Sequence, residues 1–179
     1  MGFGVELIFD TGSEARIKSL WDVLAEATGN TYLLDSGSRP HISLALFESL
    51  EGVDLRDALA SFALANAPLS LRLSAVGMFP GAECVVYLAP VVTRGLLDAH
   101  SSLYRCLREL PIRSLPYYQP ERWMPHCTVA YDVTPRQVGE AVDAICGSGV
   151  FGEVRLTEIA LVEFEPARHI CSFPLTGGD

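Results

Sequence analysis

The sequence has 179 residues, of which 49% are hydrophobic and 20% are charged, and its formal net charge is −9. This length and composition are typical of one globular domain and exclude an intrinsically disordered chain. The 13 basic and 22 acidic residues disfavour an extended footprint on nucleic acid, which would need many cations on the phosphates, but permit a small anionic ligand in a locally positive site.

Lysine occurs once, at Lys18, and arginine supplies the other basic residues. A ligase that works through a lysyl-nucleotide intermediate needs a lysine nucleophile in a pocket. Lys18 lies in a helical pattern that predicts a solvent-facing side chain. ATP-driven ligation of that type is therefore disfavoured.

The cysteine pattern and the N-terminal residues predict a cytoplasmic protein. The five cysteines are dispersed and form no Cys-x-x-Cys pair, which indicates reduced thiols. The N-terminal MGFGVELIFD has no basic segment or cleavage pattern of a signal peptide. The apolar run over 84–92 is too short to cross a membrane. We therefore expect a soluble monomer with no membrane partner.

In the first half of the chain, periodicity predicts three strands and two helices. Ser13 is the expected N-cap of the first helix and Gly29 its expected stop. Pro68 prevents the second helix from continuing. In chain order we predict a strand at 5–9, a helix at 13–28, a loop at 30–39, a strand at 41–47, a helix at 55–65 and a strand at 69–79.

The second half repeats this order after a turn at Pro80 and Gly81. Thr134 is the expected N-cap of its last helix, with Pro135 at the first helical position. We predict a strand at 84–88, a helix at 93–110, a loop at 111–124, a strand at 126–131, a helix at 134–146, and strands at 152–164 and 169–173.

The repeated order is accompanied by a short repeat of sequence. His41 and His126 lie 85 positions apart (126 less 41), and at that offset PHISLA over 40–45 aligns with PHCTVA over 125–130. Two of the chain's four histidines fall on this match, which chance alignment of apolar residues rarely achieves. We infer a duplication. The predicted fold is α+β: one bilobal domain over 1–179, with halves at 1–80 and 81–179 related by a pseudo-two-fold axis.

Each repeated unit predicts a small chemical site. Because strand side chains alternate between faces, His41 and Ser43 share one face, as do His126 and Thr128, while Cys127 points into the core. Two lobes related by a pseudo-two-fold axis would bring two imidazoles and two hydroxyls together across a groove. Histidine titrates near neutral pH, so one ring can act as base and the other as acid in phosphodiester cleavage. The hydroxyls can donate to the phosphate oxygens.

These two units resemble the paired His-x-Thr/Ser motifs of the 2H phosphoesterase superfamily, which includes 2′-5′ RNA ligase-like proteins and cyclic nucleotide phosphodiesterases. The resemblance implies a groove between two lobes, His41 and His126 as the acid–base pair, and Ser43 and Thr128 as phosphate ligands. Two imidazoles and two hydroxyls can perform this reaction without a metal, and we expect no cofactor. The implied substrates are nucleoside 2′,3′-cyclic phosphates, ADP-ribose 1″,2″-cyclic phosphate and 2′-5′ linked oligonucleotides, so the expected partner is a small cyclic phosphate or nucleotide, or a short RNA end.

One position departs from that family. Ligase-like members often carry a basic residue shortly after the second motif, where this chain has Tyr131. The departure removes one candidate phosphate contact and makes RNA-end substrates less expected.

The loop before the second motif is rich in aromatic residues, which can either stack on a nucleobase or pack the loop onto its lobe. Positive charge near the motifs comes from arginines on both loops. The candidate substrate-binding residues are Tyr117, Tyr118, Arg122, Trp123 and Arg39.

Three other functions compete with a cyclic phosphodiesterase, and one of them is a 2′-5′ RNA ligase or phosphodiesterase activity on RNA ends. The same groove could bind a nucleotide or RNA end without turnover, although both histidines and both hydroxyls are retained. A cysteine-nucleophile hydrolase is disfavoured because Cys127 should face the core. His-rich and Cys-rich metal motifs are absent from the sequence.

Overall fold

A computed structural model describes residues 2–164 and 166–177. Within these residues, seven strands form one antiparallel sheet in the order β2-β1-β6-β3-β4-β5, and β7 pairs with β6. The strands are β1 (Gly2–Phe9), β2 (His41–Phe47), β3 (Leu69–Phe79), β4 (Val85–Pro90), β5 (Cys127–Ala130), β6 (Gly152–Phe164) and β7 (Arg168–Pro174). The α+β class predicted from the sequence is confirmed.

Helices follow the strands in the predicted order, with two additions. The longer helices are α1 (Thr11–Thr28), α3 (Arg56–Ala65), α4 (Arg94–Leu107) and α5 (Pro135–Gly147). The loop predicted over 30–39 contains the short helix α2 (Tyr32–Asp35), and the loop over 111–124 contains the 3₁₀ turn η1 (Pro116–Tyr118). Single turns of this kind have too few residues to show a helical period.

The predicted N-cap of α1 was wrong. Asp10 caps the helix, because its Oδ1 accepts the backbone N–H of Ser13 at 2.8 Å. Ser13 instead lies in the first turn, where its Oγ accepts the backbone N–H of Arg155 at 3.2 Å. Both residue types cap helices well, and Asp10 is the first residue after β1 ends. The cap at Thr134 is confirmed, with a capping box to Gln137.

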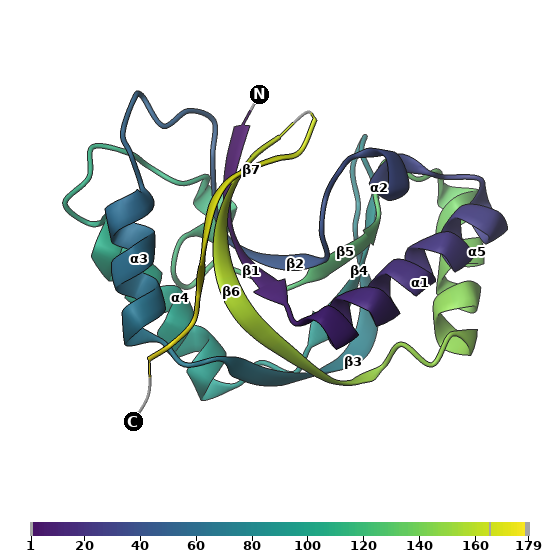
Figure 1. The fold of residues 1–179 in the computed structure, drawn as a ribbon. Helices are drawn as coiled ribbons and strands as arrows, with labels where there is room; N and C mark the ends of the chain where they lie inside the picture. The colour runs from purple at the N-terminus through teal and green to yellow at the C-terminus, as the bar shows by residue number, and fades with distance from the viewer. Residues whose placement is uncertain (1, 165, 178–179) are drawn as a thin grey trace.

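The sheet is divided into two wings, as Figure 1 shows. The first wing holds β1, β2, β7 and most of β6, flanked by α3 and α4. The second holds β3, β4 and β5, flanked by α1 and α5. The wings join where β6 pairs with β3 over the short register from Leu69↔Leu156 to Leu73↔Gly152. The edge strands β2 and β5 lie side by side between the wings.

Each wing takes elements from both halves of the sequence. Helix α1 from the first half packs on α5 from the second, and α3 packs on α4 in the same way. The two wings in space therefore do not coincide with the two halves of the sequence. The division at residue 80 remains a proposal about the sequence repeat.

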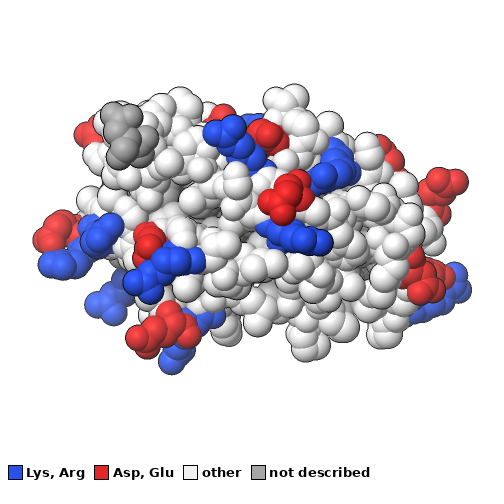
Figure 2. Space-filling model, turned by 90° about the horizontal axis from the view of Figure 1, so that it is seen from below, with Lys and Arg blue, Asp and Glu red and all other residues white. Residues whose placement is uncertain are grey.

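Charged side chains of both signs are interspersed on the face seen from below in Figure 2, and uncharged residues occupy most of it. Among the described residues drawn there, no basic area is continuous enough to follow a nucleic-acid backbone. In the described part of the chain, no helix combines the length and hydropathy required to span a bilayer.

Candidate active site

The two repeated histidines lie at matching places on the two edge strands. His41 is the first residue of β2, and His126 directly precedes β5. Their neighbours Ile42 and Cys127 are fully buried at 0% exposure, on the core side of the sheet. This confirms the predicted inward orientation of Cys127, whose burial raises the pKa of its thiol to about 12. The histidines themselves are half-buried and face away from the core.

Both imidazole rings are held by the same hydrogen bond. The Nδ1 atom of His41 is 2.7 Å from the carbonyl oxygen of Arg39, and Nδ1 of His126 is 2.7 Å from that of Met124. A carbonyl oxygen only accepts hydrogen bonds, so Nδ1 carries the hydrogen in each ring. In the neutral form each ring therefore presents Nε2 as the basic nitrogen.

The two rings are electrostatically coupled. Burial lowers the pKa of His41 below its ordinary value of 6.5. Burial also lowers the pKa of His126, the hydrogen bond to Met124 opposes this shift, and the nearby His41 lowers the pKa further. Because a charged imidazole at one position disfavours a charge at the other, the site disfavours protonation of both rings at once.

The two hydroxyls predicted to accompany the histidines differ in access. Ser43 is only 6% exposed, whereas Thr128 is half-buried. Burial and, to a smaller extent, Glu6 raise the pKa of the Tyr118 phenol to about 12, and the Ser43 side chain opposes this shift. Tyr118 is therefore the loop residue that reaches the first motif.

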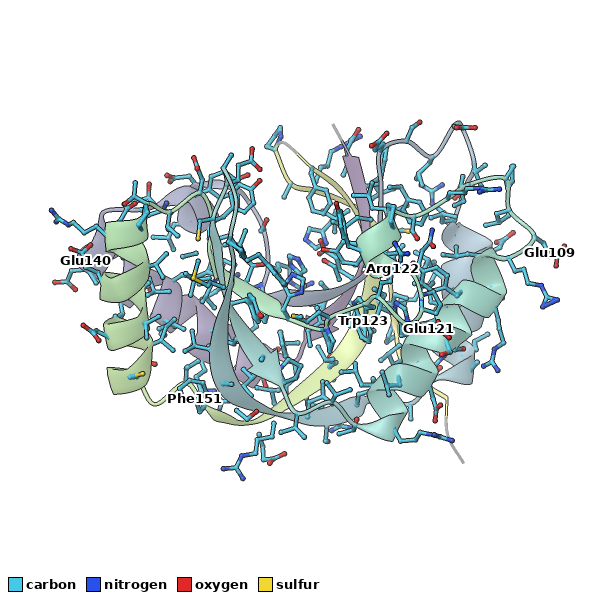
Figure 3. The ribbon with its side chains drawn as sticks, turned by 180° about the vertical axis from the view of Figure 1, so that it is seen from behind. Glu109, Glu121, Arg122, Trp123, Glu140 and Phe151 are labelled. Atoms are coloured by element: carbon cyan, nitrogen blue, oxygen red, sulfur yellow. The ribbon has the colours of Figure 1, made fainter. Side chains whose placement is uncertain are left out.

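Trp123 is the second loop residue at the site. Its Nε1 donates to the carbonyl oxygen of Ser43 at 2.9 Å. Its ring stacks on His100, with centroids 4.1 Å apart and an interplanar angle of 7°. His100 Nε2 in turn lies 2.8 Å from the carbonyl oxygen of Tyr118. This chain of contacts fixes the loop to β2, and Figure 3 shows Trp123 nearest the middle of the molecule among the three labelled loop residues.

The other three candidate substrate-binding residues are exposed or have other partners. Tyr117 is 76% exposed, and Arg122 is also exposed. The guanidinium of Arg39 is held by Glu14 at 2.8 Å and by Glu158 at 3.1 Å. These two carboxylates offset much of the positive charge that Arg39 would offer a phosphate.

His126 lies among aromatic rings. Its ring centroid is 4.8 Å from that of Phe79 and 5.4 Å from that of Tyr87. Tyr87 lies opposite Gly77 in the β3–β4 pair, where a Cβ on the glycine would meet the tyrosine ring at 2.5 Å. Gly77 therefore makes room for the ring that packs beside His126.

Glu6 is a site residue that the sequence analysis did not identify. It lies opposite Ser43 in the β1–β2 register and is 2% exposed, and its Oε1 is 3.4 Å from Nε2 of His41. That oxygen has no hydrogen-bond partner among the described residues. The signal was present, because Val5, Leu7 and Phe9 face the core and alternation places Glu6 on the histidine face.

Burial of Glu6 predicts a pH-dependent stability. Burial raises the pKa of its carboxyl from 4.5 to about 8, and Arg39 opposes the shift. The folded protein then holds a proton that the unfolded chain releases, so this contribution is complete below about pH 4.5 and is lost as the pH rises to about 8. The loss is on the order of 4 kcal/mol.

Urea unfolding of wild type and Glu6→Gln at a series of pH values measures this effect. We expect the wild-type free energy of unfolding to fall across this range, and the variant, which has no titrating group at this position, to show a smaller fall. Parallel stability curves for the two proteins would contradict the raised pKa.

Within the described residues, no three His, Cys, Asp or Glu side chains gather in an arrangement that could hold a metal ion.

Comparisons with known proteins identify the family. Residues 11–168 match the 2′-5′ RNA ligase superfamily. The chain belongs to this superfamily. This confirms the resemblance to the 2H phosphoesterases that the two motifs indicated. No curated protein sequence matches the chain.

Several solved structures share the fold of this superfamily member. TT0787 of Thermus thermophilus is 20% identical, with both chains covered over 100% and a TM-score of 0.68. LigT of E. coli, solved with 3′-AMP, is 17% identical over 97% of this chain and 94% of that one, with a TM-score of 0.59. Usb1 of Kluyveromyces marxianus is 10% identical over 97% of each chain, with a TM-score of 0.51. At these identities the likeness establishes the fold.

Proposed function

We propose that this protein is a metal-independent phosphoesterase that hydrolyses a small cyclic phosphodiester. The observation that carries the proposal is the matched presentation of two imidazoles. His41 begins the edge strand β2 and His126 directly precedes the edge strand β5, and each uses Nδ1 for a backbone carbonyl and keeps Nε2 for proton transfer. Membership of the 2′-5′ RNA ligase superfamily supports a phosphoesterase or RNA-end-processing role.

In the proposed reaction, one histidine takes a proton from water as the water oxygen attacks phosphorus. The other histidine protonates the leaving oxygen as its bond to phosphorus breaks. The hydroxyls of Thr128 and Ser43 donate to the non-bridging oxygens, where negative charge increases in the transition state. Ser43 is the less accessible of the two, because it is only 6% exposed.

The proposed substrates are a nucleoside 2′,3′-cyclic phosphate or ADP-ribose 1″,2″-cyclic phosphate. Structures of E. coli LigT with 3′-AMP, NADP+ and ATP support a nucleotide-sized ligand. We propose Tyr118 and Trp123 as supports of the site, and the exposed Tyr117 and Arg122 as contacts for the nucleoside. Arg39 is a weaker candidate for substrate binding because its guanidinium already pairs with two carboxylates.

Processing of RNA ends is the second candidate. The fold shared with Usb1 and LigT favours it. Tyr131 does not favour it, because this residue replaces the basic residue expected after the second motif.

A substrate panel separates these candidates. Purified protein is given nucleoside 2′,3′-cyclic phosphates, ADP-ribose 1″,2″-cyclic phosphate and a short 2′-5′ linked oligonucleotide, each with and without EDTA. We expect hydrolysis of at least one small cyclic phosphate at a rate that EDTA does not change. The His41→Ala and His126→Ala variants, purified in the same way, control for contaminating phosphodiesterases. Turnover of the oligonucleotide alone, or activity that requires a divalent ion, would overturn the proposal.

A further inference from the structure

The two wings place different side chains beside their histidines. Glu6 on β1 lies opposite Ser43 on β2, and the corresponding position in the other wing is Tyr87 on β4, opposite Thr128 on β5. Thus His41 has a carboxyl group near its Nε2, whereas His126 packs against the rings of Tyr87 and Phe79. The two wings therefore differ at this position, which carries a carboxyl group in the first wing and a phenol in the second.

The environment of Glu6 leaves His41 as its proton partner. Arg39 acts on Glu6 electrostatically, but its guanidinium is bonded to Glu14 and Glu158. From η1, the phenol of Tyr118 interacts electrostatically with the same carboxyl. The Oε1 atom of Glu6 has no hydrogen-bond partner among the described residues and lies 3.4 Å from Nε2 of His41.

A buried carboxylate without a close cation is costly, and so is a buried imidazolium without a close anion. Both costs are avoided when one proton serves the two groups. Two other imidazoles interact electrostatically with His41, His126 beside β5 and His169 on β7, and a positive charge on either one disfavours a positive charge on His41.

We propose that Glu6 and His41 share one proton near neutral pH, which makes His41 the general acid and leaves His126 as the general base. Glu6 is then a positioning residue that acts through His41 and does not touch the substrate. This inference rests on the proposed function and adds to it the direction of proton transfer.

The proton balance of the step is complete. Water gives a proton to Nε2 of His126 as its oxygen bonds to phosphorus. The bond from phosphorus to the leaving oxygen breaks, and that oxygen takes the proton from Nε2 of His41. This leaves a neutral His41 and a Glu6 carboxylate. His126 then releases its proton to solvent, and the Glu6–His41 pair takes one up.

The pH profile of Glu6→Gln tests this assignment. A bell-shaped profile rises as the base loses its proton and falls as the acid loses its proton. The amide cannot share the proton, so we expect the falling limb of kcat/KM to move to lower pH by about one unit, which lowers the rate about tenfold at pH 8.5. The rising limb should move less. The matched control is Glu163→Gln on β6, whose carboxylate accepts from Arg168 Nε at 3.0 Å and should leave both limbs in place. An unshifted falling limb would overturn the proposal.

A second measurement does not depend on activity. Ring-nitrogen NMR signals of His41, assigned with His41→Ala, are followed from pH 5 to 10 in the absence of substrate. We expect a step in wild type at the pH where the pair loses its shared proton, and no such step in Glu6→Gln. The same titration of the His41 signals in wild type and Glu6→Gln would contradict the inference. If His41 showed this titration step but the protein hydrolysed no phosphodiester, the shared proton would be supported and the proposed function would be rejected.

Discussion

Alanine in place of either His41 or His126 is expected to lower kcat/KM by about 10²- to 10⁴-fold, because each ring supplies one of the two proton transfers. The double variant should lose little more than the worse single variant, since two groups that serve one concerted step act as a unit. The measurement is kcat/KM for both single variants and the double variant on a cyclic phosphate that the wild type accepts.

Circular dichroism on each variant confirms that it is folded. His169→Ala is the matched control, because His169 is an exposed histidine on β7 and should keep most of the activity. His100→Ala is a poorer control, because His100 stacks on Trp123 and is only 3% exposed. A folded His41→Ala or His126→Ala protein with near wild-type activity would disprove the two-histidine mechanism.

Truncation of Trp123 is expected to cause the largest loss of stability among the loop residues. Trp123→Ala removes a half-buried ring, its stack on His100 and its hydrogen bond to the carbonyl oxygen of Ser43. We expect a loss on the order of 3 kcal/mol in the free energy of unfolding. Activity should also fall, because the same hydrogen bond holds the backbone of the first motif.

The neighbouring Tyr117→Ala is the matched control, since its side chain is 76% exposed and its loss should change stability by less than about 0.5 kcal/mol. Trp123→Phe separates the two contributions, because it keeps a ring against His100 and loses the donor to Ser43. Urea unfolding curves for the three variants provide the comparison. Equal stability of Trp123→Ala and Tyr117→Ala would show that Trp123 does not anchor the loop.

The sequence by itself determined the order of the elements and the local geometry of the two motifs. Alternation along a strand depends on adjacent residues, so it placed Cys127 correctly in the core, with His126 and Thr128 on the other face of β5. Helix caps are similarly local, and the cap at Thr134 was predicted from a few residues. At the start of α1, where Asp10 and Ser13 both suit the role, local preference alone did not decide between them.

The tertiary structure decided which strands are neighbours and which charges meet. Strand pairing connects distant segments, so the place of β6 between β1 and β3 could not be read from local patterns. The same pairing brings Glu6 to His41 and draws Arg39 to Glu14 and Glu158. The pKa of a carboxyl or imidazole depends on burial and on nearby charges, which are properties of the folded chain. The motifs therefore predicted two chemically similar histidines, and only the packing around them made the two different.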